Sequence, residues 1–533
     1  MGTRFTRRRF LTALSAGAAY LALTNTVGCE LLGRTSKLTA LHIPGFSPLR
    51  APKIWPLPSV SPPPEEGVWD FRSRPDLSPA AVDVTTRARE DTAPGYVFVA
   101  LKEGAGEHGP MIIDDQGQLV WFGKYRSARD FKMQYYQGRP VLTWWEGKVT
   151  AGHGVGEYVI FDSSYREITR VRAGNGYRGD LHEFFITSED TALLVAYAPR
   201  RWDLSSIGGS QDGMAWEGIV QEVDIETGEV LFEWHSLEHV GIEESYIEPP
   251  DDPNHLYDYF HINSIDVEPG GNLLLCARNT WAVYKLDRKS GEIIWRLDGK
   301  KSDFEMGPGT QSAFQHDARR QRDGTITIFD NGAHPKVHDR SRGIVVELDE
   351  QKMSAKLVRE YTSPKKRLST SQGNMQLLPN SNVLIGWGSG RYVSEFSHKG
   401  ELLFETRFPP DGESYRAYRF PWSGYPTDEP AVAVEKGPDD KVKLYASWNG
   451  ATEVATWEVL AGPRQSRLAS VGSVPRDSFE TAMLVQTFDP YVAVRANDRL
   501  GQPLGTSACE AVNTKVHNSA YDRRSWAVWP KER

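Results

Sequence analysis

Between residues 258 and 332 the chain repeats one order of apolar and polar positions. A histidine opens an apolar-leaning run, FHINSIDV and later FQHDARRQ, and a turn and a β-rich strand follow each run. Between the copies lie the strands WAVYKLD and EIIWRLD, joined by the turn RKSG. Alternating strands with short turns predict antiparallel four-stranded sheets. Two sheets with a histidine at the same step predict a repeat architecture with side chains arranged around an axis.

The same order recurs from Tyr96 at intervals of roughly 50 residues, near the period of propeller blades. Six units fit the pattern, and in at least four of them a hairpin is followed by a strand pair, as the WAVYKLD–EIIWRLD hairpin is followed by the FQHDARRQ strand. We therefore predict an all-β protein with a six-bladed β-propeller over residues 93–425. A strand near Tyr96 is expected to pair into the last blade. Seven blades remains the alternative, because the first and last units match least well.

The chain on either side of the predicted propeller has a different texture. Short alternating strands over residues 430–513 predict an immunoglobulin-like or fibronectin-III-like β-sandwich, and residues 514–533 form a polar tail. Residues 30–92 include a proline-rich stretch, which favours extended structure. This segment is either a linker or a wrap along the next domain, and Trp55 and Trp69 favour the wrap, because pure linkers contain few aromatic residues.

The N-terminus predicts export. Residues 1–29 contain Thr-Arg-Arg-Arg-Phe-Leu at 6–11, which matches the twin-arginine signal pattern, and an apolar run follows. The run ends in TVGC, which resembles a lipoprotein box with Cys29 as the lipidated residue. We expect an extracellular or cell-envelope protein whose contact with the membrane is limited to a lipid anchor at Cys29.

Composition excludes several classes of function. The 533 residues carry a net charge of −8 with scattered basic residues, so no basic stripe indicates nucleic-acid binding. The sequence contains no dinucleotide fingerprint, Walker loop, HExxH or CxxC motif, and we assign no cofactor and no metal ligands. Three cysteines make no disulfide framework. Cys276 and Cys509 are interpreted as buried free thiols, with a bridge between them as the alternative.

Several stretches resemble the bacterial arylsulfotransferase family, in its actinobacterial and fungal-type branch. They include DLHEF, QEVDIETGEVLFEW, HINSIDV, GEIIWRLDG, FQHDARR, FDNG, SQGNMQ and YRAYRFPW. The resemblance implies a six-bladed propeller with its active site in the central funnel. It also implies transfer of a sulfuryl group from an aryl sulfate to a phenol through a transiently sulfated histidine, without a nucleotide donor. Family members are exported, in agreement with the N-terminal signal.

Three histidines are the leading candidates for this chemistry. His182, His261 and His316 occupy the same step of successive units, and neutral imidazole is a competent nucleophile near pH 7. We favour His316 as the nucleophile and His261 as the acid/base or oxygen donor, and the reverse assignment stays open. Arg416 matches a family arginine near the funnel and is expected to hold sulfonate charge. The resemblance places the sulfated histidine one blade later, where this chain has Ser371.

Other polar and aromatic side chains are assigned to the same rim. The predicted substrate-binding residues are His182, Asn263, Asn331, Gln372, Asn374 and Arg342. The aromatic residues that could form an aryl-accepting wall, or else pack between blades, are Trp144, Trp145, Trp216, Trp387 and Tyr415.

Two other functions compete with aryl sulfotransfer. A non-catalytic propeller that binds a ligand or an envelope partner is favoured by the serine at position 371. A hydrolase or lyase with a metal ion in the funnel would use the three in-register histidines. Propellers host many activities, so the fold does not decide between these functions.

Overall fold

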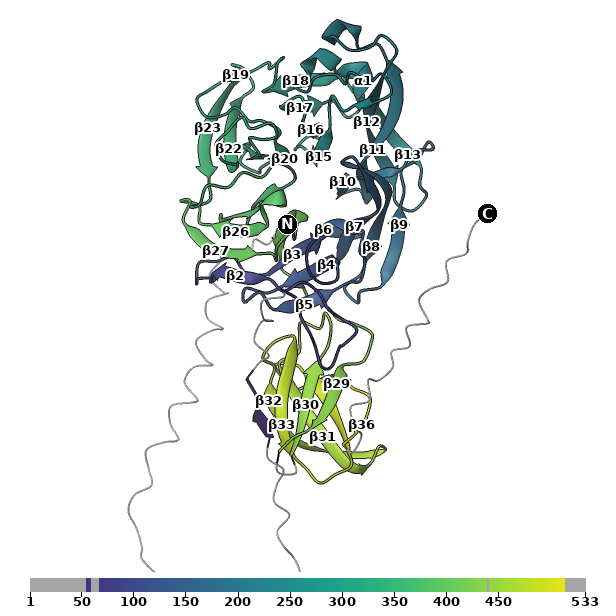
Figure 1. Ribbon diagram of the computed structural model, residues 1–533, viewed down its shortest axis with the longest axis vertical. Coiled ribbons are helices and arrows are strands. Elements are labelled where there is room, and N and C mark those ends of the chain that lie inside the picture. The colour runs from purple at the N-terminus through teal and green to yellow at the C-terminus, as the bar shows by residue number, and fades with distance from the viewer. Residues whose placement is uncertain (1–53, 59–66, 439–440, 513–533) are drawn as a thin grey trace, which may run out of the picture. The chain divides into compact units, whose positions relative to one another are not determined.

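The computed structural model describes residues 54–58, 67–438 and 441–512, and their regular secondary structure is nearly all β-strand (Figure 1). The described helices are short: α1 (Ser236–His239) and the 3₁₀ turns Ser205–Ile207, Ile242–Glu244 and Gly388–Gly390. None of these helices is long and apolar enough to cross a membrane. The twin-arginine motif, Cys29 and the C-terminal tail lie outside the described residues.

Strands between residues 96 and 420 form five sheets, the largest of which has nine strands and divides into two groups, and the four main strands of each group pair antiparallel. The six groups of four are β6 (Arg129–Tyr136), β7 (Arg139–Thr150), β8 (His153–Phe161), β9 (Glu167–Val171); β10 (Gly179–Ile186), β11 (Thr191–Trp202), β12 (Gly213–Asp224), β13 (Val230–His235); β15 (Ile262–Val267), β16 (Leu273–Ala277), β17 (Ala282–Leu286), β18 (Ile293–Leu297); β20 (His316–Arg320), β21 (Ile326–Asp330), β22 (Arg342–Asp349), β23 (Ser354–Tyr361); β24 (Asn374–Leu377), β25 (Val383–Gly386), β26 (Tyr392–Phe396), β27 (Leu402–Arg407); and β28 (Ser414–Phe420), β3 (Tyr96–Leu101), β4 (Gly109–Ile113), β5 (Leu119–Phe122).

Short strands extend several of these groups: β14 (Leu256–Tyr257) pairs with β12, β19 (Glu305–Met306) with β23, and β2 (Asp83–Thr86) with β27.

The nine-stranded sheet is two groups joined at a single point. Strands β8 and β10 pair only at Gly156 and Gly179. A Cβ atom on Gly156 would lie 2.0 Å from the backbone oxygen of Glu146, and one on Gly179 would lie 2.6 Å from the ring of Tyr158. Only glycine allows so close an approach of two backbones. The groups β6–β9 and β10–β13 are therefore separate units that touch at a glycine pair.

One strand pairing predicted from the sequence is wrong. Strands β17 and β18, the WAVYKLD–EIIWRLD hairpin, pair back onto β16 and not forward onto β20. The reason is the length of the connections, because residues 278–281 form a tight link between β16 and β17, whereas residues 298–315 separate β18 from β20. The groups that contain His182 and His316 therefore begin with the histidine-bearing strand, and His261 directly precedes the first strand of its group.

One strand of each group contacts the corresponding strand of the next group in a closed cycle: β6, β10, β15, β20, β24, β28 and again β6. Successive groups also share apolar clusters. Cys276 and Trp295 of one group pack with Ile326 of the next, for example, and Phe98 and Trp121 pack with Trp144. Large aromatic and branched side chains thus fill the space between neighbouring sheets, and their burial supplies the main stabilisation of the arrangement.

The pairing expected near Tyr96 is confirmed. Strand β3 lies antiparallel to β28, with Tyr96 opposite Phe420 and Leu101 opposite Ser414. The first strand of this region along the chain, β3, therefore pairs with the last, β28.

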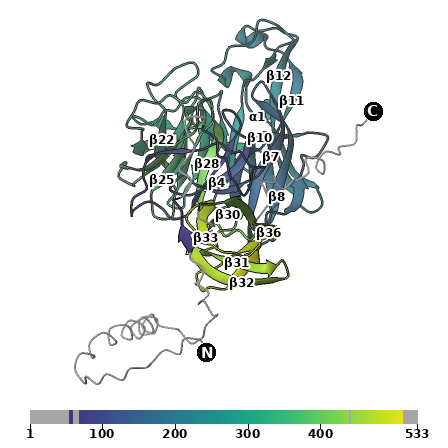
Figure 2. The same cartoon turned by 60° about the horizontal axis from the view of Figure 1, so that its bottom comes forward.

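The C-terminal strands form two sheets over one apolar cluster (Figure 2). One sheet holds β1 (Ile54–Pro56), β29 (Ala431–Lys436), β30 (Lys441–Ser447) and β33 (Glu480–Gln486). The other holds β31 (Thr456–Arg464), β32 (Arg467–Pro475), β34 (Tyr491–Asn497), β35 (Pro503–Thr506) and β36 (Glu510–Ala511). Trp457 is buried in the cluster and Trp448 packs against it. The count of six blades and the immunoglobulin-like sandwich stay predictions.

The described parts of the proline-rich segment are ordered against later strands. Strand β1 pairs with β33, and β2 pairs with β27. Trp69 and Phe71 are buried, and the ring of Phe71 lies 4.4 Å from that of Phe479. These contacts correspond to a wrap along the domain.

Cys276 and Cys509 are both free, so the alternative of a bridge between them is wrong. Cys276 is buried, and burial raises the pKa of its thiol to about 12. Cys509 is only half-buried, contrary to prediction, because it lies beside the short strand β36, which pairs only with β34.

Candidate functional site

Two of the three predicted histidines are in direct contact. Nε2 of His261 lies 3.1 Å from Nε2 of His182, and the two rings meet edge to face. His182 lies within β10 and His261 immediately precedes β15, and these neighbouring strands contact each other. The repeat of the histidine along the sequence therefore becomes a pair of side chains in space.

Each ring of this pair contacts a carboxylate through its Nδ1 atom, on the side opposite the other histidine. Nδ1 of His182 is hydrogen-bonded to Asp180, and Nδ1 of His261 lies 2.5 Å from Oδ2 of Asp258. Burial, together with the neighbouring histidines, lowers the pKa of His261 to about 4 although Asp258 favours the charged form. His261 also adopts a φ of 60°, a conformation that costs a side-chain-bearing residue about 1–3 kcal/mol. Strain of this kind is typical of functional positions.

His153, which no sequence pattern indicated, completes the cluster. It opens β8 at the tip of the β7–β8 hairpin, and its ring lies 5.2 Å from that of His261. Its ring centre also lies 4.3 Å from that of Tyr197 and 4.8 Å from that of Trp216. His153 carries no signal along the sequence because it belongs to a hairpin tip outside the repeated step.

His316 stands apart from the pair and has a defined tautomer. The side-chain NH₂ of Asn331 donates to the carbonyls of Ser369 and Gln372, so its Oδ1 faces Nδ1 of His316 at 2.8 Å. Nδ1 therefore carries the proton, and Nε2 keeps a lone pair, toward which the backbone N–H of Gln372 points at 3.3 Å. Burial and the charge of Arg278 keep the pKa of His316 well below its usual range, so this ring is neutral.

Arg278 is a second residue that no sequence pattern indicated. It follows β16, and its backbone N–H donates to the carbonyl of His261. Its guanidinium lies 4.9 Å from the ring centre of Phe314 and donates to the side chain of Asn279. No carboxylate of residues 67–438 or the other described ranges forms an ion pair with Arg278. This half-buried cation near His316 can hold an anionic group.

Arg416 lies on β28 among the first strands of the groups, and its charge is taken up by buried carboxylates of β6, β10 and β20. Its side chain is fully buried and contacts Asp130 at 3.1 Å, Glu183 at 3.3 Å and Asp317 at 3.4 Å. Lys132 and Arg319 belong to the same buried network. The neighbouring residue Tyr415, and not Arg416, faces His182, because successive side chains of a strand point to opposite sides.

The predicted substrate-binding amides divide into two kinds. Asn331 and the backbone of Gln372 bind His316, as described above. Asn263 and Asn374 bridge neighbouring strands. The side chain of Asn263 accepts from the backbone N–H of Asp317 and donates to the carbonyl of Gln315. The side chain of Asn374 accepts from the backbone N–H of Ala417 and donates to the carbonyl of the same residue. Their geometry gives them a structural role.

Arg342 is also occupied, because it pairs with Asp330 and Glu360 and donates to the carbonyl of Gln311. It does not join the histidines.

Two of the five candidate aromatic residues face the histidine cluster. The ring of Trp216 is tilted against that of His153, and Tyr415 lies 5.6 Å from His182, ring centre to ring centre. Trp144, Trp145 and Trp387 are buried in the packing between sheets. An aryl group entering the cluster would therefore meet Trp216 and Tyr415.

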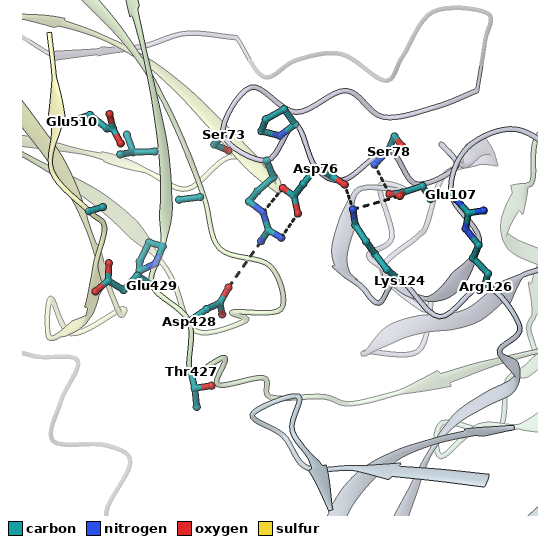
Figure 3. Close-up of a pocket in the computed structure, with 16 residues that line it drawn as sticks. Ser73, Asp76, Ser78, Glu107, Lys124, Arg126, Thr427, Asp428, Glu429 and Glu510 are labelled. Carbon is teal, nitrogen blue, oxygen red and sulfur yellow. Dashed lines mark hydrogen bonds and ion pairs between the residues drawn. The ribbon is translucent and has the colours of Figure 1, made fainter. Parts of the chain in front are cut away.

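A large cavity of about 1100 Å³ lies away from this chemistry (Figure 3). Its lining comes from residues 73–78 and 427–432 and includes Glu107 and Lys124. The charged groups neutralise one another, with Arg74 on Asp76 and Lys124 on Glu107 (Figure 3). The cavity contains no histidine, and we assign the active site to the histidine cluster.

Residues 132–409, just over half of the chain, match the family model Arylsulfotransferase (ASST), and this range contains every histidine described above. The chain belongs to the arylsulfotransferase family. The family supports an aryl sulfotransferase activity in general terms, with aryl sulfates and phenols as substrates. The match does not distinguish the actinobacterial and fungal-type branch. A comparison with curated proteins gave no match.

Solved structures show distant likeness to this arylsulfotransferase family member. A Bacteroides caccae protein of unknown function is 14% identical with a TM-score of 0.37, covering 61% of this chain and 98% of that one. Catalytically inactive virginiamycin B lyase from Staphylococcus aureus is 8% identical with a TM-score of 0.28, covering 68% and 96%. Saccharomyces cerevisiae Sqt1 is 11% identical with a TM-score of 0.31, covering 67% and 79%. At these TM-scores the likenesses define neither fold nor function.

Proposed function

We propose that this protein transfers a sulfuryl group from an aryl sulfate to a phenol through a sulfated His316. The observation that supports this assignment is the tautomer of His316, whose Nδ1 proton is held by Asn331 and whose Nε2 lone pair lies in a region of positive charge from Arg278. A neutral imidazole with a fixed lone pair acts as a nucleophile once the long 3.3 Å contact from the backbone N–H of Gln372 opens. Ser371, at the position where the resemblance puts the sulfated histidine, neighbours Gln372, whose backbone contacts His316.

The reaction has two steps. The Nε2 lone pair of His316 attacks sulfur, the bond between sulfur and the aryl oxygen breaks, and the electron pair leaves with the phenolate. The acceptor phenol then attacks sulfur, the N–S bond breaks, and the lone pair returns to Nε2. Arg278 neutralises the sulfonate oxygens in both steps, as cations do in phosphoryl transfer. The departing phenolate takes up a proton in the first step and the acceptor phenol releases one in the second, and we assign this exchange to the cluster of His153, His182 and His261.

We infer that the scaffold is a six-bladed β-propeller followed by an immunoglobulin-like or fibronectin-III-like sandwich. The closed cycle of contacts among β6, β10, β15, β20, β24 and β28 supports six blades. The two C-terminal sheets over one cluster support the sandwich.

The wild-type protein tests the proposal directly. With p-nitrophenyl sulfate as donor, we expect p-nitrophenol release to accelerate when phenol is added, and phenyl sulfate to accumulate in equal amount. Binding of the donor without turnover, with every phenol tried, would support a non-catalytic binding propeller in its place.

Replacing Arg278 with glutamine is expected to lower kcat/KM for p-nitrophenyl sulfate about 10²–10³-fold, the loss typical of one charge-stabilising donor. The Arg278→Lys variant should recover part of the loss, because it restores the charge without the planar fork. Arg166→Gln is the matched control, since Arg166 is an exposed arginine on a surface turn. Full activity in Arg278→Gln would remove Arg278 from the site.

Export remains part of the proposal. We propose that the mature protein is carried across the cytoplasmic membrane by the twin-arginine route and anchored at Cys29. Replacing Arg7 and Arg8 together with lysine should retain the precursor in the cytoplasm, and cell fractionation measures this. Cys29→Ala should move exported protein from the membrane to the soluble fraction. Unchanged export of the double variant argues against the twin-arginine route.

A further inference from the structure

The His182–His261 pair contains one contact too many for two neutral imidazoles. Nδ1 of His182 meets Asp180, Nδ1 of His261 meets Asp258 at 2.5 Å, and the two Nε2 atoms meet at 3.1 Å. Each contact joins two atoms that carry lone pairs, so each needs a cation between them. Two neutral imidazoles supply only two N–H protons. A third cation, either a proton or a metal ion, is therefore required.

His153 shows where a metal ion would fit. Neither of its ring nitrogens has a hydrogen-bond partner among the described residues, although the side chain is only 4% exposed. Its Nε2 lies 3.5 Å from Oδ2 of Asp258, beyond the ordinary hydrogen-bond length of about 2.7–3.2 Å. The other oxygen of Asp258, Oδ1, is also buried without a partner. Buried polar groups are rarely left without a partner, and an ion bound between His153 and Asp258 would supply one to both.

We infer that His153, Asp258 and His261 bind a divalent transition-metal ion of the zinc class. One ligand atom from each residue lies within 4.8 Å of the others. Metal–ligand bonds of about 2.0–2.2 Å place the ligand atoms of a tetrahedral site about 3.3 Å apart. The 2.5 Å distance between Nδ1 of His261 and Oδ2 of Asp258 must therefore lengthen by less than about 1 Å. Two imidazoles and one carboxylate form the ligand set of catalytic zinc and ferrous sites, which keep open positions for substrate.

This placement accounts for every contact of the pair. With the metal on Nδ1 of His261, the proton of that ring moves to Nε2 and is donated to Nε2 of His182. His182 in turn donates its Nδ1 proton to Asp180. Metal-ligating histidines characteristically donate their other N–H to such a partner, which fixes the ring. All three histidines are then neutral, as buried histidines favour.

The surroundings allow an ion to enter. The side chain of Asp258 is 25% exposed, whereas those of His153 and His261 are 4% and 10% exposed, so the path from solvent runs past the carboxylate. The charges of Arg278 and Asp258 attract each other, so Arg278 weakens binding of a cation to Asp258 without occupying a ligand atom. Tyr197 and Trp216 form an apolar wall behind His153.

Metal binding is measured on the full exported chain without substrate, so the result is independent of the proposed transfer reaction. After dialysis against a chelator, the protein is titrated with Zn²⁺ by calorimetry and with Co²⁺ by visible absorption. We expect one equivalent of each ion and the intense d–d bands of a four- or five-coordinate Co²⁺ site. His153→Ala should weaken zinc binding by at least 10–100-fold, the range that even outer-shell partners contribute.

His235→Ala is the matched control, because His235 also lies between two carboxylates, Glu233 at 3.0 Å and Glu217 at 3.2 Å. Its zinc affinity should equal that of the wild type. Asp258→Asn gives a second test that keeps the size of the side chain, should His153→Ala fail to fold. If the wild type binds neither ion, the third cation is a proton on the histidine pair and the metal site is rejected. Equal zinc binding by wild type, His153→Ala and Asp258→Asn would likewise reject it.

Discussion

His316→Ala is expected to abolish acceptor-dependent transfer from p-nitrophenyl sulfate. The variant lacks the atom that forms the N–S bond, so neither half of the reaction can proceed by the proposed route. Loss of a residue that only holds charge, such as Arg278, should leave a rate about 10²–10³-fold lower but measurable. One transfer assay therefore distinguishes loss of the nucleophile from loss of a charge-holding residue. As a second measurement, mass spectrometry should detect a sulfated protein in the wild type and none in His316→Ala.

The pH profile gives an independent check on the same residue. Burial holds the pKa of His316 well below its usual range, so the neutral, nucleophilic form persists as the pH falls through 6.5. Transfer limited by His316 should therefore stay active at pH values where an ordinary histidine is protonated. His398→Ala is the control, since His398 is exposed on the β26–β27 turn. If His316→Ala keeps full transfer, the nucleophile is another histidine, and His261→Ala is then the variant to measure.

The sequence could predict the histidine pair because both residues occupy one step of a repeated unit. Strands of equal order in successive groups contact one another, so equal steps come together, and His182 meets His261. The order of polar and apolar positions was enough to place these residues, the pairing of β3 with β28 and the nearly all-β fold.

Other parts of the site depend on contacts that no repeat records. His153 reaches the cluster from a hairpin tip, and Arg278 reaches it from the short link between β16 and β17. Asp180 and Asp258 precede their histidines by two and three residues, but they lie behind the rings only because of the irregularity in β10 and the positive φ of His261 just before β15. Positions of this kind follow from loop geometry and not from hydrophobic periodicity.

Arg416 lies among the first strands of the groups, but Tyr415 and not Arg416 meets the histidine pair, for a local reason. Tyr415 and Arg416 are adjacent in β28, and adjacent strand residues face opposite ways. A β-bulge between Ser414 and Ala417 sets which of the two faces the histidines, and the apolar pattern does not specify a bulge. Tyr415 contacts His182, and Arg416 enters the buried ion network.

Arg416→Met is expected to lower the free energy of unfolding by about 3–5 kcal/mol, the usual effect of removing one partner from a buried ionic network. The loss would leave Asp130, Glu183 and Asp317 facing only Lys132 and Arg319. Burial alone would raise the pKa of Glu183, but Arg319, Arg416 and Lys132 hold it below its usual range, so the carboxylate stays charged in the interior. The variant must therefore either keep an uncompensated charge or take up a proton.

Denaturant unfolding at pH 7 measures the change, and Arg166→Met is the control for an exposed arginine, with an expected loss of at most about 1 kcal/mol. The destabilisation of Arg416→Met should shrink at low pH, because protonation of the carboxylates removes the unpaired charge that the substitution exposes. At a temperature where the variant is folded, its kcat should be near that of the wild type. Unchanged stability with a 10²–10³-fold lower kcat would instead place Arg416 in contact with the sulfuryl group, as the sequence predicts.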